Sequence, residues 1–324
     1  MKEIGGYLGF GTSYNNVHFK NAVALNSGRN SFEYILKAKG VKIVYLPFYI
    51  CDSIVTTLKK NNITFEYYHI SENLEPFFDK KLLLNEVILY VNYFGICDKI
   101  VDKVIAKFHP NVIVDNAQAF FSTPRKQTSA FYSPRKFIGV PDGGYAICDP
   151  PLKGEWPKDD SHDRLKHLFA RIESGAESGF EDYRKNEKLI AELSLRNMSS
   201  TTIEMLKAIN YKKVNKIRKK NFLYLHSHLD RINKFRIDND ISSGPLCYPF
   251  LTDQNDLKAY LIYNKIFVPT YWQEVLEQKQ CTDFERHLAE ALVPIPIDQR
   301  YEKKDLDNIL NLLRSHHGNL FQGF

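Results

Sequence analysis

The sequence predicts an α/β fold, in which a large domain with a mostly parallel sheet is followed by a smaller α+β domain. Between about Val23 and Cys148, short apolar runs alternate with segments of helical spacing, which is the rhythm of βαβ units. The chain has 324 residues, of which 44% are hydrophobic. A chain of this length usually divides into more than one hydrophobic core. We therefore expect two domains, with the sheet in the first.

Five apolar runs are predicted to be strands of this sheet, and several are apolar throughout, as buried parallel strands are. They cover residues 41–46, 64–68, 86–91, 112–114 and 144–148. Residues 53–61 and 97–107 carry helical spacing between them. Ligands of such sheets bind beyond the carboxyl ends of the strands, where Asn92, Asp115 and residues 47–49 fall.

The predicted boundaries place the large domain at residues 1–190, a bridging helix at 191–231 and the small α+β domain at 232–324. A polar insert at 151–190, with a loop-like stretch at 173–179, is either a mobile connection or a substrate-facing segment. A helical pattern runs from Lys188 to about Arg231. The small domain is suggested by apolar runs at 246–251 and 266–269 and by a helix at 305–313.

Composition narrows the class of protein. The net charge of +6 fits attraction to phosphates or nucleotides, but 44 basic and 38 acidic residues make a mixed surface that does not require nucleic acid. No stretch approaches the roughly 18 apolar residues of a membrane span, and the opening Met-Lys-Glu-Ile-Gly-Gly lacks the core of a secretory signal. We expect a cytoplasmic protein. Its five cysteines lack CxxC spacing, which argues against a disulfide framework and a zinc site.

The most informative stretch is Lys136-Phe-Ile-Gly-Val-Pro-Asp-Gly-Gly144, in which Lys136 stands 21 residues after Asp115. A lysine amine can condense with an aldehyde, and a carboxylate ending an apolar strand can keep a ring nitrogen protonated. Pyridoxal phosphate chemistry needs both groups. Taken alone, Lys136 and Arg135 could be basic loop residues, and Asp115 could cap the next helix.

Other residues could hold such a cofactor. The turn Ser27-Gly28-Arg29-Asn30 precedes a helical segment, whose free backbone N–H groups can bind a phosphate; an ordinary capped turn is the alternative. Tyr49, or Phe48 beside it, could stack on a ring or be a plain core aromatic.

The order of these motifs resembles that of the DegT-type (StrS-like) sugar aminotransferases, which are fold-type-I pyridoxal-phosphate enzymes. The resemblance rests on Asn26-Ser-Gly-Arg-Asn30, Pro47-Phe-Tyr49, Val91-Asn-Tyr-Phe-Gly95, Asp115-Asn-Ala-Gln118, Lys136 with Gly143-Gly144, and Pro296-Ile-Asp-Gln-Arg-Tyr301. It implies an aspartate-aminotransferase-like, three-layer α/β/α large domain. It also implies a homodimer that transfers an amino group from an amino acid, such as glutamate, to a nucleotide-linked keto sugar for polysaccharide or surface-glycan synthesis.

The resemblance also assigns roles. Lys136 would form the Schiff base and move the proton, and Asp115 would face the pyridine nitrogen. The implied cofactor-binding set is Gly28, Arg29, Asn30, Tyr49, Asn92, Asp115, Gln118, Ser133 and Lys136.

Two positions depart from the family pattern. Phe131 stands where relatives show a phosphate-binding serine, leaving Ser133 and Ser129 as substitutes. Leu195-Arg-Asn-Met198 stands where relatives show Asn-x-Arg-Met, which reaches the neighbouring subunit's cofactor. A different pyridoxal-phosphate reaction, such as sugar dehydration, and a non-catalytic binding or regulatory protein are therefore alternatives.

Other chemistries have less support in the sequence. It has no GxGxxG or GxxxxGK[ST] after a strand and no GxSxG elbow. His162 and His167 are not at i, i+4 spacing, and His316-His317 lacks accompanying ligands, so we expect no metal site.

Overall fold

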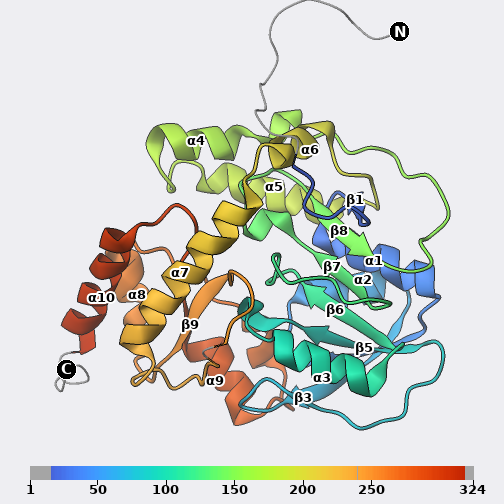
Figure 1. The fold of residues 1–324 in the computed structure, drawn as a ribbon, viewed down its shortest axis with the longest axis horizontal. Coiled ribbons are helices and arrows are strands. Elements are labelled where there is room, and N and C mark those ends of the chain that lie inside the picture. The colour runs from blue at the N-terminus through green and yellow to red at the C-terminus, as the bar shows by residue number, and fades with distance from the viewer. Residues whose placement is uncertain (1–15, 239, 318–324) are drawn as a thin grey trace, which may run out of the picture.

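The computed structural model describes residues 16–238 and 240–317, and an eight-stranded sheet forms its centre (Figure 1). The strand order is β1-β8-β7-β6-β5-β2-β3-β4. The strands are β1 (Val23–Leu25), β2 (Ile43–Pro47), β3 (Thr64–Ile70), β4 (Pro76–Phe77), β5 (Glu86–Val91), β6 (Val112–Asn116), β7 (Ser129–Tyr132) and β8 (Gly144–Ile147). The run from β7 to β3 is parallel, whereas β8, β1 and β4 pair antiparallel to their neighbours. The sheet is thus mixed, with a parallel centre.

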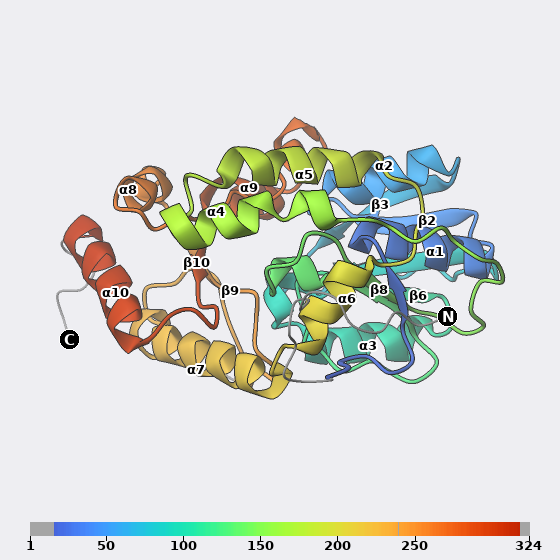
Figure 2. The same ribbon diagram turned by 90° about the horizontal axis from the view of Figure 1, so that it is seen from above.

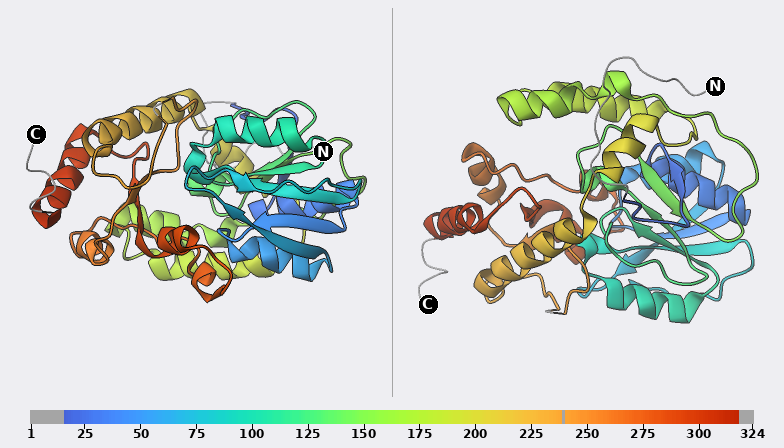
Figure 3. Two further views of the ribbon diagram at one scale, coloured as in Figure 1. Left: turned by 90° about the horizontal axis from the view of Figure 1, so that it is seen from below. Right: turned by 45° about the horizontal axis from the view of Figure 1, so that its top comes forward.

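Helices cover both faces of the sheet. Helices α1 (Gly28–Lys39) and α2 (Asp52–Lys60) lie on one face and α3 (Asp98–Phe108) on the other (Figures 2 and 3). The Ser27 hydroxyl caps α1 by accepting from the Asn30 N–H. Gly40 ends α1 with a φ of 59°, which a residue without Cβ adopts without strain. This three-layer α/β/α arrangement confirms the predicted fold class.

The five predicted strands are all present, as β2, β3, β5, β6 and β8, with ends shifted by one or a few residues. The three-residue β1 and two-residue β4 are too short to show a hydrophobic period. β7 has four residues, all buried, and was also not predicted. The positions of these three strands are set by hydrogen bonding to their neighbours in the sheet.

A second hydrophobic cluster lies beyond the sheet. It is built from α7 (Tyr211–Leu229), α8 (Leu257–Tyr263), α10 (Lys303–His317) and the antiparallel pair β9 (Cys247–Leu251) and β10 (Leu292–Pro296). Helix α9 (Asp283–Ala291) packs instead into the sheet-side cluster, through Leu288, Ala289 and Ala291. β9 and α10 match predicted segments. Residues 266–269, predicted as a further apolar element, form no strand, and β9 pairs with β10 instead. Helix α7 contributes Val214 to the sheet-side cluster and Phe222 to the second.

The single helix expected over 191–231 is wrong. The segment contains the end of α5 (Phe180–Glu192), then α6 (Ser200–Lys207), then α7. Side-chain caps explain the breaks, because Ser199 accepts from the Thr202 N–H and Asn210 accepts from the Lys213 N–H, and each starts a new helix.

The polar insert folds mainly into helices. Helix α4 (Lys166–Ser174) and α5 lie side by side (Figure 2), and residues 175–179 connect them. The opening six residues, on which the expectation of no signal peptide was based, lie outside the described residues. Among residues 16–238 and 240–317, none of the helices has the length and apolar character needed to cross a bilayer.

Candidate functional site

Asp115 and Lys136 come together at the carboxyl ends of two neighbouring parallel strands. Asp115 is the second-last residue of β6, and in the register of the sheet it pairs with Phe131 of β7. Lys136 closes the short 3-10 helix Pro134–Lys136, which follows β7. Asp115 is only 7% exposed, and one carboxylate oxygen accepts the Ala117 N–H at 2.8 Å.

The Asp115 carboxyl is influenced by its burial and by the charge of Lys136. Burial raises the pKa of the Asp115 carboxyl to about 6, while the positive charge of Lys136 and the Ala117 N–H pull it down. The carboxyl is therefore mostly ionised at pH 7. The charge of Lys136 therefore acts on the Asp115 carboxyl, although the two residues are 21 positions apart in the sequence.

Position 131 belongs to the core. Phe131 is buried against the Phe32 ring, with centroids 5.3 Å apart. Ser133 instead lies beside the start of α1, because a Cβ at Gly28 would stand 3.4 Å from the Ser133 Cβ. Ser129, the other substitute, bonds to the Cys148 sulfur at the far end of β7. Ser133 is thus the serine placed near the helix start.

The Gly143-Gly144 pair packs against the same helix start. The Gly143 N–H donates to the Asn26 carbonyl at 2.8 Å, and a Cβ at Gly144 would lie 2.2 Å from the Ser27 carbonyl oxygen. Only glycine allows this approach. The Asn30 amide points elsewhere, since it donates to Asn26 Oδ1 at 2.8 Å and to the Ser194 carbonyl at 2.9 Å.

Gln118 and Asn92 differ in how their amides are used. Gln118 Oε1 accepts the Phe94 N–H at 2.8 Å, and its buried Nε2 has no acceptor in the described part of the chain. Asn92 donates to Asp98 and Asn116 and accepts the Cys97 N–H, so its amide is used within the protein. Gln118 alone of the two offers a free buried donor.

Tyr49 lies in an aromatic cluster. Its ring meets the Trp272 edge at 4.5 Å and stacks near Tyr93 at 5.8 Å. Burial raises the pKa of the Tyr49 hydroxyl, which has no partner among the described residues. Phe48 stacks on Tyr67 and His69 instead.

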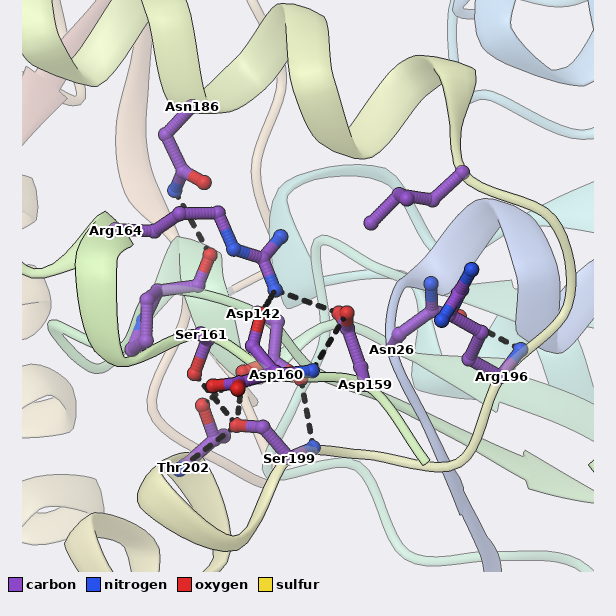
Figure 4. Close-up of polar contacts among 12 residues, drawn as sticks. Asn26, Asp142, Asp159, Asp160, Ser161, Arg164, Asn186, Arg196, Ser199 and Thr202 are labelled. Carbon is purple, nitrogen blue, oxygen red and sulfur yellow. Dashed lines mark hydrogen bonds and ion pairs between the residues drawn. The ribbon is translucent and has the colours of Figure 1, made fainter. Parts of the chain in front are cut away.

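Arg135 also lies close to charged groups. Its guanidinium pairs with Glu187 of α5, and burial lowers its pKa, as do the positive charges of Arg164 and Arg29. Arg164 pairs with buried Asp159 at 2.7 Å. Figure 4 shows Arg164 reaching Asp159. Arg29, the remaining predicted residue, is therefore near Arg135.

Sequence reasoning did not single out Asp142, although it lies in the stretch after Lys136. Its fully buried carboxylate accepts the Ser199 N–H at 2.9 Å, the Ser199 hydroxyl at 2.6 Å and the Thr202 hydroxyl (Figure 4). These bonds connect the segment that follows Lys136 to the start of α6. The signal available in the sequence was an acidic residue between Pro141 and Gly143.

Comparison with known proteins extends this picture. No family model matches the sequence, and no curated protein matches it. Solved structures do match. A DegT DnrJ EryC1 StrS aminotransferase from Brucella abortus has a TM-score of 0.63 at 13% identity, over 92% of this chain and 86% of that one.

Two further structures match as well. S. venezuelae DesV in complex with a ketimine intermediate has a TM-score of 0.64 at 17% identity, over 91% of this chain and 84% of that one. The sugar aminotransferase CalS13 from Micromonospora echinospora has a TM-score of 0.61 at 15% identity, over 91% and 87%. The chain therefore has the fold of the DegT-type sugar aminotransferases, as the order of its motifs predicted.

Proposed function

We propose that this protein is a pyridoxal-phosphate-dependent aminotransferase. The observation that carries the proposal is the meeting of Asp115 and Lys136 at the carboxyl ends of β6 and β7. That is where ligands bind in parallel α/β sheets. A buried carboxylate beside an amine supplies the two groups that this cofactor requires.

The surrounding residues fit the cofactor. Gln118 offers a buried Nε2 donor with no acceptor in the described part of the chain, and a buried donor is costly unless a ligand accepts from it. Ser133 and the first N–H groups of α1 form a place for a phosphate, because a helix start carries free donors and positive potential. Asp115 and Lys136 would meet the ring nitrogen and the aldehyde carbon, respectively.

Each group then has a task. When bound, pyridoxal phosphate supplies an electron-accepting ring that stabilises negative charge on the substrate's α-carbon. The Asp115 carboxylate would accept the N–H of the ring nitrogen and keep that proton in place. The Lys136 amine would attach the cofactor by condensing with its aldehyde, with loss of water. Once an amino donor had displaced it, the freed amine would take the proton from the substrate's α-carbon.

We further propose that the acceptor is a nucleotide-linked keto sugar, that the donor is an amino acid such as glutamate, and that the product serves polysaccharide or surface-glycan synthesis. Support comes from CalS13, a neighbour of the same fold that is described as a sugar aminotransferase. Homodimer formation is supported by apolar side chains exposed on α4 and α5. These are Phe169, Ile172, Phe180, Tyr183 and Leu189.

The test is the absorbance spectrum of the purified protein with added pyridoxal phosphate, before and after borohydride reduction. We expect a visible band that reduction traps on the peptide containing Lys136. Lys136→Ala should show no trapped adduct. Lys126→Ala, which removes an exposed lysine in the loop before β7, is the matched control and should behave as the wild type.

The same experiment can refute the proposal. A wild type without a band at saturating cofactor would leave a cofactor-free binding protein as the better description. Trapping on another lysine would refute the assignment of Lys136.

A further inference from the structure

Arg218 of α7 is a buried cation that holds the backbone next to Lys136. It is only 2% exposed. Its Nη2 lies 3.4 Å from the Phe137 carbonyl oxygen, and its guanidinium carbon lies 4.6 Å from the centre of the Phe137 ring. Gln299 Nε2 donates to the same carbonyl at 2.9 Å, and Gln299 Oε1 accepts from Arg218 Nε at 3.0 Å. The side chains of Arg218 and Gln299, which are bonded to each other, thus both bond to the backbone of the residue that follows Lys136.

The second terminal nitrogen of the Arg218 guanidinium bonds to a different segment of the backbone, at residues 245–246. Its Nη1 donates to the Pro245 and Leu246 carbonyls, both at 3.1 Å. The Leu246 N–H donates to the Phe94 carbonyl at 2.8 Å, and the Phe94 N–H donates to Gln118. One guanidinium therefore connects the backbone beside Lys136 with the backbone that holds Gln118.

Burying this charge has a cost, and the contacts around it explain how the cost is offset. Burial lowers the pKa of Arg218 to about 10, and the charge of Asp298 works against that fall, so the group stays protonated at neutral pH. In the described part of the chain, the carbonyls of Phe137, Pro245 and Leu246 and the Gln299 amide accept its hydrogen bonds. A planar fork of donors suits several acceptors at once, whereas lysine has one compact donor group.

We propose that Arg218 and Gln299 form a clamp on the Phe137 carbonyl, and that this clamp positions the Lys136 amine for condensation with the cofactor aldehyde. In that step a C=N bond would replace the C=O bond, and the oxygen would leave as water. Both are positioning residues. The inference rests on the proposed function, because it concerns the lysine that attaches pyridoxal phosphate. A side chain that must meet a reacting atom needs a fixed backbone, since a displacement of about 1 Å can cost up to about a hundredfold in rate.

The test compares Gln299→Met and Arg218→Lys with Asn221→Ala. Asn221 is a matched control: it lies on the same helix, is buried, and donates to the carbonyls of Ile297, Asp298 and Tyr301. A general loosening of the loop at 297–301 would affect all three variants. Loss of the clamp would affect only the first two.

Two measurements separate attachment from binding. The first is the rate at which the visible band forms after mixing with pyridoxal phosphate. The second is the Kd for pyridoxamine phosphate, which has no aldehyde and cannot attach to a lysine. We expect attachment to Lys136 to slow by about tenfold or more in the clamp variants, with the Kd changed by less than about threefold and Asn221→Ala near the wild type in both.

A third measurement needs no cofactor. The Phe137 and Ile138 N–H groups both donate to the Pro134 carbonyl, so hydrogen exchange of this peptide reports its local opening. Gln299→Met should exchange here about tenfold faster than Asn221→Ala. Gln299 is only partly buried, so this variant keeps the test decisive if Arg218→Lys fails to fold.

The outcomes are distinguishable. If the wild type attaches no cofactor at Lys136, the proposed function fails. If the wild type attaches it and Gln299→Met matches Asn221→Ala in attachment rate and in exchange, the clamp is refuted while the proposed function stands.

Discussion

Replacing Asp115 with asparagine should stabilise the cofactor-free protein while removing its chemistry. The carboxyl titrates at about pH 6 in the folded chain, against an ordinary value of 3.8. At about 1.4 kcal/mol for each pH unit of difference, the ionised carboxylate costs the folded state about 3 kcal/mol. Asparagine has the same shape, can keep the bond from the Ala117 N–H, and carries no charge to bury.

The direction of the pH dependence of stability follows from the number of protons that the folded and unfolded states bind. Between pH 3.8 and 6 the folded state holds a proton on Asp115 that the unfolded chain has lost, so stability falls as pH rises through this window. The advantage of Asp115→Asn should be complete above about pH 7, roughly half as large at pH 5 and close to zero at about pH 3.

Urea unfolding of the wild type and Asp115→Asn at pH 8, 5 and 3, without cofactor, measures this advantage. With cofactor, the variant should transaminate on the order of a hundredfold more slowly, because the carboxylate no longer stabilises the ring N–H. The reasoning is refuted if the variant is equally or less stable than the wild type at pH 8, or if the difference does not shrink with falling pH.

Two further substitutions test the phosphate end of the site. Gly144→Ala should lower the free energy of unfolding by about 1 to 3 kcal/mol, because its Cβ would collide with the Ser27 carbonyl. Urea unfolding measures this loss. The control is Gly139→Ala, whose Cβ would meet only a Leu168 side chain at 3.4 Å, and an equal loss of stability in this control would contradict the argument. Ser133→Ala should weaken pyridoxamine phosphate binding by about tenfold, the value of one hydrogen bond to a charged group, in a fluorescence titration; an unchanged Kd, or an equal loss in Ser129→Ala, would remove Ser133 from the phosphate site.

The sheet and the pairing of Asp115 with Lys136 could be predicted from the sequence because both depend on local patterns. Apolar runs such as 86–91 mark buried strands wherever they occur. Parallel strands bring their carboxyl ends to one edge, so a polar residue ending a strand, such as Asp115, is placed by topology alone. The order of short motifs then sufficed to indicate the fold.

Other features depended on packing between distant segments. Position 131 is a core residue because β7 faces Phe32, and Ser133 reaches the start of α1 only after the chain turns. The helical pattern at 191–231 continues through residues 199 and 210, but the side chains of these two residues cap new helices. The spacing of apolar residues gives no information about such caps.

The clamp on Phe137 joins residues from three distant parts of the chain, and no spacing rule links Arg218 or Gln299 to Lys136. The sequence by itself determined the sheet and the chemical groups at its edge, since strand periodicity and strand ends are local. Only the tertiary structure decided which long side chains hold those groups in place, because such contacts depend on how α7 and the residues after β10 pack against the lysine segment.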